Sequence, residues 1–412
     1  MDLVINQGRL SSEIEELASI SEAEPPVVTR IVFGPADRKA RAWMISLCES
    51  AGLSVRHDAI GNIFARWKGS DPLAAAVGTG SHIDAIPNAG KYDGVVGVLG
   101  GLEAIRSLQE SGFHPRNSIE LLVFTSEEPT RFGIGCLGSR LLSGTLSATG
   151  AEKLTDKDGA SLGLIRAGAG FHGDLNGVRL PSGYYKAFLE LHIEQGPVLE
   201  REQISLGVVV KIAAPASFRI VIEGSGGHEG AVLMPDRRDA LCAAAEIILA
   251  IENAAKTSGG PDTVATVGIC DVFPSAINSI PASVTLAVDV RDTDLTRRDD
   301  VLRQVSAFCA DISISRQVST RIEPLNADDP ATCAPELVEA LSKSCRDRGL
   351  KFLPMISRAY HDSLFMSRVA PTAMLFIPCR NGYSHRPDEY ADPEDISRGV
   401  LVLAETLSAL SA

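Results

Sequence analysis

The chain alternates between short apolar runs and longer stretches in which apolar residues recur every three or four positions. The apolar runs predict strands at residues 74–80, 118–124, 189–194 and 373–377. The helical spacing predicts helices at residues 11–21, 37–51, 95–111, 236–257, 296–312, 334–349 and 394–409. Because strands and helices alternate, we expect an α/β fold with a mixed, mostly parallel sheet that has helices on both faces.

The pattern changes after residue 208. From there to about residue 326 the order is strand, strand, long helix, strand, strand, helix, strand, which is close to the ferredoxin-like α+β arrangement. Alternation of helix and strand then resumes, in a segment too short to form a core of its own. We therefore predict a larger domain of residues 1–208 and 327–412, interrupted by a smaller inserted domain of residues 209–326.

Composition narrows the classes of function. At 412 residues, 45% hydrophobic and 22% charged, the chain has the composition of a soluble globular protein with two domains. A net charge of −13 argues against nucleic acid or a membrane surface as a partner. We expect a cytoplasmic protein, because no signal peptide or membrane-spanning apolar run is evident. The eight scattered cysteines predict free, mostly buried thiols in a reducing compartment.

Residues 80–94 combine one histidine with two carboxylates. His82 and Asp84 are two positions apart, so an extended backbone directs both to one face, as suits a metal-binding histidine supported by a carboxylate. Asp93 follows a turn rich in Pro, Asn and Gly that can fold it back toward His82. Taken alone, this stretch fits a solvated loop with incidental polar residues equally well.

Other predicted strand ends carry further candidates, namely Glu128, His192 and His385. Singly, each is more often a satisfied polar residue than a ligand. Together with His82 and Asp93 they form a set of three histidines and two carboxylates, which suits Zn²⁺, Mn²⁺, Co²⁺ or Ni²⁺ better than Ca²⁺ or Mg²⁺. Five ligands exceed the needs of one tetrahedral ion, whereas two ions about 3.5–4 Å apart that share a carboxylate would use them all.

The adjacent Glu127 and Glu128 need different roles, because two neighbouring carboxylates repel unless a cation lies between them. A metal-bound Glu128 beside a proton-shuttling Glu127 resolves this conflict. A serine or cysteine nucleophile is disfavoured, because the chain has no Gly-x-Ser-x-Gly motif and no cysteine with a suitable histidine pattern.

Several motifs occur in order along essentially the whole chain: Gly-Ser-His-Ile-Asp, Lys-Tyr-Asp-Gly, Ser-Glu-Glu, Leu-Glu-Leu-His-Ile-Glu-Gln-Gly-Pro, Gly-Gly-His, Ala-Ile-Asn-Ser-Ile-Pro and Ser-His-Arg-Pro-Asp-Glu. On these motifs the chain resembles the M20 metallopeptidase/amidase superfamily, and within it the dinuclear amidohydrolases that act on ureido compounds. The run Ser-Arg-Ala-Tyr-His-Asp-Ser-Leu-Phe-Met resembles the ureidoglycolate amidohydrolases, whereas the allantoate branch has Ser-Gly-Ala-Gly-His-Asp there.

The resemblance implies a role for each candidate residue. It implies metal ligation by His82, Asp93, Glu128, His192 and His385, with Asp93 bridging two Mn²⁺ ions per subunit and Zn²⁺, Co²⁺ or Ni²⁺ as alternatives. It implies that Asp84 orients His82 and that Glu127 is the general base. It also implies substrate binding by Gln195 and His361 on the larger domain and by Asn278 and Arg291 on the smaller one. His228 would enter the site of a partner subunit, in a homodimer formed through the smaller domain.

The implied reaction is hydrolysis of the ureido C–N bond of (S)-ureidoglycolate, a small anionic ureide, to glyoxylate, ammonia and carbon dioxide in purine and allantoin catabolism. A metal-activated bridging water would attack, and Glu127 would move the proton. Allantoate or N-carbamoyl-L-amino-acid hydrolysis is the alternative of the same class, and a peptidase is a further one. A metal-free binding protein is the alternative of a different class. Glu229 departs from the resemblance, because this branch usually has Ala there, and a carboxylate close to His228 would favour the imidazolium.

Overall fold

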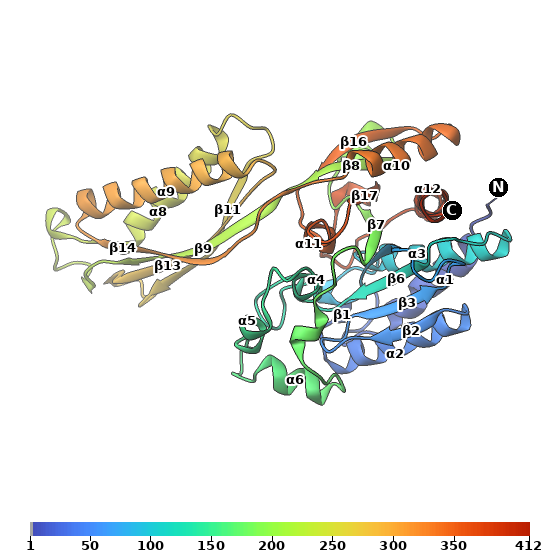
Figure 1. The fold of residues 1–412 in the computed structure, drawn as a ribbon. Coiled ribbons are helices and arrows are strands. Elements are labelled where there is room, and N and C mark those ends of the chain that lie inside the picture. Colours follow the sequence, from blue (N-terminus) through green and yellow to red (C-terminus); the bar gives the residue numbers. More distant parts are fainter. Residues whose placement is uncertain (1–2) are drawn as a thin grey trace. The chain divides into compact units, whose positions relative to one another are not determined.

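The computed structural model describes residues 3–412 and divides into two compact units (Figure 1). The larger unit comprises the chain up to Val210 together with Thr332–Ser357 and His361–Ala412. The smaller unit comprises Lys211–Ala331 and Arg358–Tyr360. Among the described residues, no helix combines the length and apolarity needed to cross a membrane. All eight cysteines are free, and all but Cys242 and Cys270 are buried.

A mixed sheet forms the centre of the larger unit. Its four central strands run parallel, in the order β17 (Thr372–Ile377), β7 (Tyr185–Ile193), β4 (Ala76–His82) and β6 (Ile119–Phe124). Every residue of β4, β6 and β17 is buried, which explains why these segments are apolar runs rather than alternating ones. Antiparallel strands extend the sheet at its edges, namely β3 (Ile63–Trp67), β2 (Ser54–His57) and β8 (Leu206–Ile212), and β16 (Phe352–Ser357) pairs with β8.

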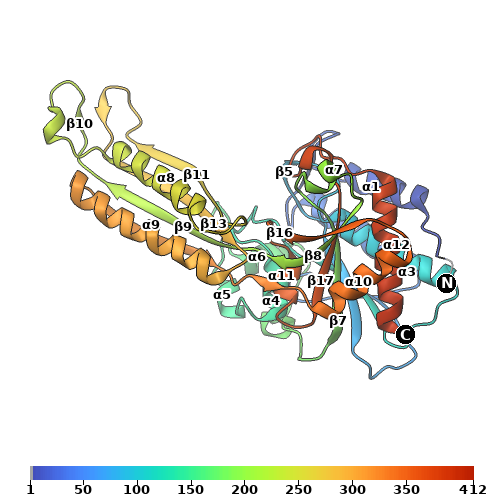
Figure 2. The ribbon, with the colours of Figure 1, turned by 90° about the horizontal axis from the view of Figure 1, so that it is seen from above.

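Helices cover this sheet, and α3 (Val95–Glu110) is buried continuously from Val95 to Leu108. It packs against β4 and β7 and lies beside α12 (Pro393–Ser411), as Figure 2 shows. A Cβ atom at Gly97 would lie 2.4 Å from the carbonyl oxygen of Leu191, so glycine permits this close approach. The other helices and short elements of this unit are α1 (Gln7–Ser19), β1 (Val28–Arg30), α2 (Pro35–Ser50), β5 (Ala85–Ala89), α4 (Leu137–Ser143), α5 (Ala148–Glu152), α6 (Leu162–Gly168), η1 (Leu175–Val178), α7 (Val198–Glu202), α10 (Pro335–Asp347), α11 (Asp362–Met366) and η3 (Arg380–Gly382).

The smaller unit is a four-stranded antiparallel sheet with two helices on one face. The strand order is β11 (Val264–Phe273), β13 (Ser283–Asp292), β9 (Ala214–Glu223) and β14 (Ser319–Ala327). The helices α8 (Ala240–Lys256) and α9 (Leu295–Arg316) bury a shared apolar cluster against it. Along β13, buried and half-buried residues alternate strictly, as expected for a sheet covered on one face. The short elements here are β10 (Gly227–His228), η2 (Met234–Asp236) and β12 (Ser279–Ile280). Strand β15 (Ala331–Thr332), within which the boundary between the units falls, pairs with β8 in the sheet of the larger unit.

This architecture confirms the predicted mixed α/β class with an α+β insertion. Helix starts differ from the predicted ones where caps override periodicity. Helix α1 begins at Gln7 rather than residue 11, because the Asn6 side chain accepts from a backbone N–H of its first turn. Helix α8 begins only at Ala240, because Asp239 caps it. The stretch predicted as a turn before Asp93 contains β5, which pairs with β1.

Candidate metal centre and active site

The parallel strands of the larger unit deliver the candidate ligands to one edge of the sheet. His82 is the last residue of β4 and lies in register with Phe124, the last residue of β6. His192 lies one residue before the end of the parallel strand β7. In open α/β sheets the carboxyl ends of the strands form the ligand-binding edge. The fold thus explains why residues far apart in the sequence converge.

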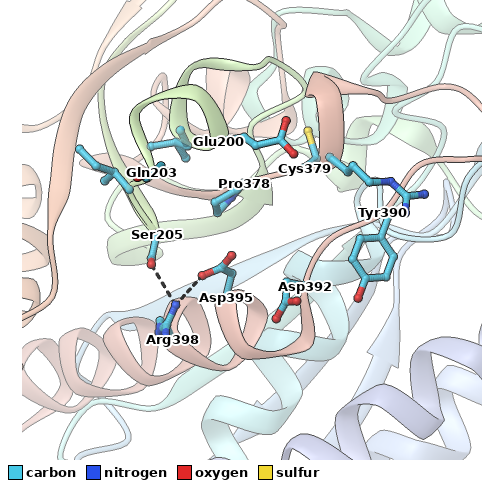
Figure 3. Close-up of a pocket in the computed structure, with 12 residues that line it drawn as sticks. Glu200, Gln203, Ser205, Pro378, Cys379, Tyr390, Asp392, Asp395 and Arg398 are labelled. Atoms are coloured by element: carbon cyan, nitrogen blue, oxygen red, sulfur yellow. Dashed lines mark hydrogen bonds and ion pairs between the residues drawn. The ribbon is translucent and has the colours of Figure 1, made fainter.

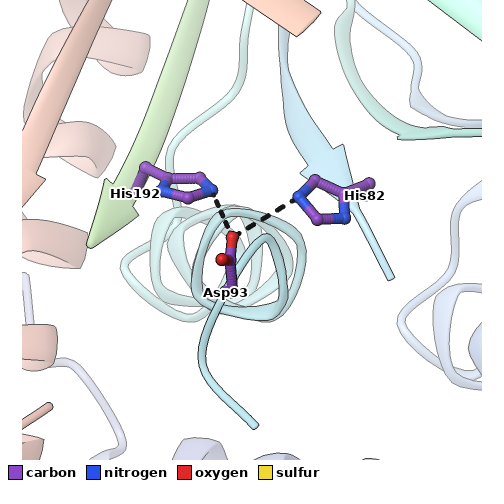
Figure 4. Close-up of side chains that lie close together, drawn as sticks. All are labelled: His82, Asp93 and His192. Atoms are coloured by element: carbon purple, nitrogen blue, oxygen red, sulfur yellow. Dashed lines mark ion pairs between the residues drawn. The ribbon is translucent and has the colours of Figure 1, made fainter. Parts of the chain in front are cut away.

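Two histidines meet one oxygen of Asp93 (Figure 4). The Nε2 atoms of His82 and His192 lie 3.6 and 3.2 Å from Asp93 Oδ1. Their Nδ1 atoms lie 3.0 and 2.9 Å from the backbone carbonyl oxygens of Asp84 and Ile193. Because a carbonyl oxygen can only accept, the proton of each neutral imidazole stays on Nδ1 and the lone pair of Nε2 faces the cluster.

The other oxygen of Asp93 faces a second set of candidate ligands, His385 and Glu128. His385 Nε2 lies 3.2 Å from Asp93 Oδ2 and 3.2 Å from Glu128 Oε1. Ligands bonded to one first-row cation at about 2.0–2.2 Å lie about 3.0–3.5 Å from one another. Both groups therefore have the spacing of ligands around a divalent cation, and the Asp93 carboxylate is common to them.

The charges of the cluster favour a cation as well. Burial opposes ionisation of Asp93, but contacts with His192, His385 and His82 outweigh it and hold the pKa of Asp93 well below its usual range. The contacts with Asp93 and Glu128 raise the pKa of His385 to about 11. Buried carboxylates that converge in this way need positive charge between them, from protons or from a metal ion.

The backbone around the cluster is unusual in several places. Gly94 has φ +67°, and a Cβ atom there would lie 2.5 Å from His82 Nε2, so only glycine fits at the start of α3. Ser126 and His385 also adopt left-handed conformations, with φ of 56° and 59°. Such conformations cost about 1–3 kcal/mol each in residues other than glycine and concentrate at functional sites.

The carboxylate of Asp84 holds the loop that carries Glu127 and Glu128. It accepts hydrogen bonds from the backbone N–H groups of Glu127 at 3.2 Å and Glu128 at 3.1 Å. The same carboxylate lies 3.8 Å from His82 Nδ1, beyond hydrogen-bonding distance, so the direct contact of Asp84 with His82 is made by its carbonyl oxygen. Burial raises the pKa of Asp84 to about 6.

Glu127 lies at the cluster and is largely buried. Its Oε2 atom is 3.8 Å from His82 Nε2, and its Oε1 atom accepts a hydrogen bond from the Cys136 thiol at 3.3 Å. Burial raises the pKa of Glu127 well above its usual range, and the neighbouring carboxylates add to this although His82 opposes it. A carboxylate that binds a proton this readily beside a cation site is suited to accept and return protons.

Two predicted substrate-binding residues of the larger unit lie beside the same cluster. Gln195 donates a hydrogen bond to Asp93 Oδ2 at 2.7 Å, while its buried Oε1 atom has no hydrogen-bond partner among the described residues. His361 is buried, and its ring centroid lies 4.4 Å from that of His192. The cluster therefore contains an acceptor, Gln195 Oε1, that a ligand can satisfy.

The remaining predicted residues lie in the smaller unit. His228 is exposed on β10, and its Nδ1 atom is 3.4 Å from the carboxylate of Glu229, the residue that departs from the family pattern. Arg291 on β13 pairs with Asp289 at 2.6 Å. Asn278 is exposed in the loop before β12.

Sequence reasoning missed residues that support the cluster from outside. Glu389 accepts hydrogen bonds from the backbone N–H groups of Tyr92 at 2.8 Å and Asp93 at 3.1 Å, which fixes the loop of the shared carboxylate. Arg30 is fully buried and donates to the carbonyl oxygen of Ile83, next to His82, at 2.6 Å. Glu389 belongs to the motif around His385, which could have flagged it, but no local pattern singles out Arg30.

A cavity of about 350 Å³ lies on the larger unit between α7, residues 378–380 and the start of α12 (Figure 3). Its lining includes charged residues that already have local partners. Arg398, for example, donates to Ser205 at 3.0 Å and to Asp395 at 2.8 Å. None of the residues that meet at Asp93 lines this cavity, so we place the candidate active site at the ligand cluster.

Comparison with known proteins agrees with this assignment. The family model described as Peptidase family M20/M25/M40 matches residues 78–409. The ureidoglycolate hydrolase of Arabidopsis thaliana is 50% identical over 99% of this chain and 87% of its own. A crystal structure of AtUAH in complex with glyoxylate superposes with a TM-score of 0.91 at 49% identity, covering 99% of this chain and 98% of the other. An N-carbamoyl-L-amino-acid amidohydrolase of a Pseudomonas species is 35% identical over 98% of both chains. These matches confirm the family and the hydrolase class that the motifs predict.

Proposed function

This chain belongs to peptidase family M20/M25/M40, and we propose that it hydrolyses the ureido C–N bond of (S)-ureidoglycolate to glyoxylate, ammonia and carbon dioxide. The observation that carries the reaction class is the Asp93 carboxylate between two ligand groups, with Glu127 beside them. The substrate is proposed from the relatives, since the Arabidopsis thaliana protein is named for it.

We propose two Mn²⁺ ions as the cofactors. His82 and His192 would hold one ion, Glu128 and His385 the other, and Asp93 both. When bound, such ions make a water nucleophilic near neutral pH and polarise the ureido carbonyl. The mixed nitrogen and oxygen ligands also suit Zn²⁺, Co²⁺ and Ni²⁺, so the metal preference is part of the proposal.

Glu127 would act as the general base. Its Oε2 atom faces the cluster and would accept a proton from the attacking water, then return it to the departing nitrogen. Burial raises its pKa, as suits a group that must both accept a proton and return it near neutral pH. Asp84, which holds the backbone of this loop, would keep Glu127 at the cluster.

Side chains from both units would recognise the substrate. Gln195 has a buried acceptor atom that no residue in the described part of the chain satisfies, which suits a ureido N–H donor. Arg291 would pair with the substrate carboxylate through two parallel hydrogen bonds, which lysine cannot form. This pairing explains how a protein with a net charge of −13 can bind an anion. His361 and Asn278 would complete the contacts.

We further propose a cytoplasmic homodimer that forms through the smaller unit, with His228 acting in the site of the partner. The edge strand β11 and the loop after it expose Ile269, Phe273 and Ile277, which are 52%, 65% and 102% exposed. Exposed apolar side chains on an uncovered edge strand favour pairing with another chain. The free thiols support a reducing compartment.

A panel of ureides tests the proposed substrate. We expect the purified protein with Mn²⁺ to have a kcat/KM for (S)-ureidoglycolate that exceeds those for allantoate and N-carbamoyl-L-amino acids by about 100-fold or more, as expected where a site hydrogen-bonds groups that the other substrates lack. A preference for an N-carbamoyl-L-amino acid would instead favour the activity of the Pseudomonas relative. A metal content well below one ion per chain, without any Mn²⁺-dependent activity, would support a binding protein.

A further inference from the structure

We propose that Cys136 is a positioning residue for Glu127, because its thiol fixes the orientation in which the carboxylate faces the metal cluster. The inference deepens the proposed function and rests on Glu127 as the base. It concerns the segment between the end of β6 and the start of α4, where the chain leaves the sheet at Thr125 and returns beside it at Cys136.

The two oxygens of Glu127 have different neighbours. Oε1 accepts the hydrogen bond from the Cys136 thiol at 3.3 Å, and Oε2 lies 3.8 Å from His82 Nε2. A glutamate side chain has several rotatable bonds, so without a contact to one of its oxygens the carboxylate would sample other orientations. The thiol contact selects the orientation in which Oε2 is the oxygen that can receive a proton from a water at the cluster.

Backbone hydrogen bonds fix the position of Cys136 beside Glu127. The N–H of Cys136 donates to the carbonyl oxygen of Glu127 at 2.8 Å, and the next two residues donate to Ser126 and Thr125 at 2.9 and 2.8 Å. These bonds tie the start of α4 to the loop of the base. Cys136 itself is left-handed, with φ 54° and ψ 35°, where glycine would be less strained. A side chain is present despite the strain, and strained residues concentrate at functional sites.

A thiol suits this task chemically. Cys136 is fully buried, and burial raises the pKa of its thiol well above the usual range, so it keeps its proton and remains a donor. An S–H group is a weak donor. A lysine or arginine there would stabilise the carboxylate strongly and make it a poorer base, whereas a thiol orients it with little such effect.

The alternative is that Cys136 merely fills space, and matched variants separate the two roles. Cys136→Ala removes the donor, while Cys136→Ser keeps a donor of similar size, and both retain a Cβ atom in the left-handed conformation. Cys136→Gly removes the donor and relieves the backbone strain, so it replaces the alanine variant if that protein fails to fold. Cys48→Ala is the control, because Cys48 is equally buried, in α2, outside the cluster.

For Cys136→Ala we expect kcat on (S)-ureidoglycolate to fall about tenfold, since a misplaced reacting group is costly, with KM and Mn²⁺ content unchanged. Cys136→Ser should recover at least about half of the wild-type kcat, and Cys48→Ala should match wild type. In a Glu127→Gln background, Cys136→Ala should cause no further loss, because it acts through Glu127.

Three results would overturn the inference: wild-type kcat in Cys136→Ala or Cys136→Gly, equal losses in Cys136→Ala and Cys136→Ser, or an additive loss on top of Glu127→Gln. A different result would show that Glu127 is not the general base. In that case Glu127→Gln alone would remain active, whatever the Cys136 variants do.

Discussion

The candidate residues of the two units differ in their burial and in the contacts that they make within the chain. In the larger unit, His82, Asp93 and His192 are buried, and the imidazole nitrogens that face away from Asp93 bond to backbone carbonyls. In the smaller unit, His228 is exposed, and Arg291 is half-buried and paired with a neighbouring aspartate. The proposed metal ligands of the larger unit are thus brought together and oriented by folding alone, whereas His228 and Arg291 of the smaller unit have only neighbouring carboxylates as partners.

The largest expected effect comes from substitutions that distinguish the roles of two adjacent residues of the larger unit, Glu127 and Glu128. Glu127→Gln should lower kcat by about 10³-fold or more with Mn²⁺ content intact, because the base is lost but the proposed ligands remain. Glu128→Gln is the matched control and should lose activity together with metal. Metal analysis and steady-state kinetics on both proteins check this. Loss of metal in Glu127→Gln, or retained turnover, would contradict the division of roles.

The next effect tests whether the smaller unit acts in a partner's site. We propose that His228 donates a hydrogen bond to the oxyanion that develops on the ureido carbonyl. His228→Ala should therefore lower kcat about 10²–10³-fold, the usual cost of removing such a donor. Mixing it with Glu127→Gln under subunit exchange should restore about a quarter of wild-type activity, since half of the dimers would be mixed and each would have one complete site. If the mixture stays as inactive as its components, His228 does not act in trans.

Binding of Mn²⁺ to the larger unit should depend on pH. The pKa of His385 is raised to about 11 in the metal-free chain, so its imidazole is protonated at pH 7 and must lose that proton when a cation binds. Affinity for Mn²⁺ should therefore rise with pH, by about tenfold per pH unit for each proton released.

Titrations of Mn²⁺ at pH 6, 7 and 8 measure this dependence. His385→Ala should bind more weakly and with a shallower dependence on pH. His57→Ala, a change of an exposed histidine on β2, should leave the dependence as it is. An affinity that is constant across this range would show that the proposed ligands are already free of protons.

The smallest expected effect concerns substrate binding by the smaller unit. Arg291→Lys should raise KM for (S)-ureidoglycolate about tenfold and change KM for uncharged ureides much less, because lysine cannot form the paired hydrogen bonds. Arg321→Lys, on the exposed strand β14 of the same unit, is the control. Equal changes in KM for charged and uncharged substrates would make Arg291 a structural residue.

The sequence predicted the candidate site best where the end of one apolar strand carries one proposed ligand. His82 and His192 lie at ends of apolar runs, and the rule that parallel strands end at one edge was enough to group them. Local spacing could not reveal contacts made across the fold. The carboxylate of Asp84 bonds to residues 43 and 44 positions away, and Arg30 contacts a carbonyl 53 positions away.

Short elements were missed for a related reason. The helices α4 and α5 are seven and five residues long, so they contain too few turns to show an apolar period. Strand β5 contains Pro87 and Asn88, which signal a turn, and Asn88 is indeed left-handed, with φ 62°. The segment nevertheless pairs with β1, across a register shift. Tertiary contacts decide the structure of such segments.

We propose above that the residues around Asp93 hold two metal ions that support ureide hydrolysis. The most direct measurement is kcat/KM on (S)-ureidoglycolate while Mn²⁺ is titrated into the metal-free protein. We expect activity that is absent without metal and saturates at two ions per chain, and we expect Asp93→Asn to lose this activation. Full activity without metal, or saturation at a single ion per chain, would contradict it.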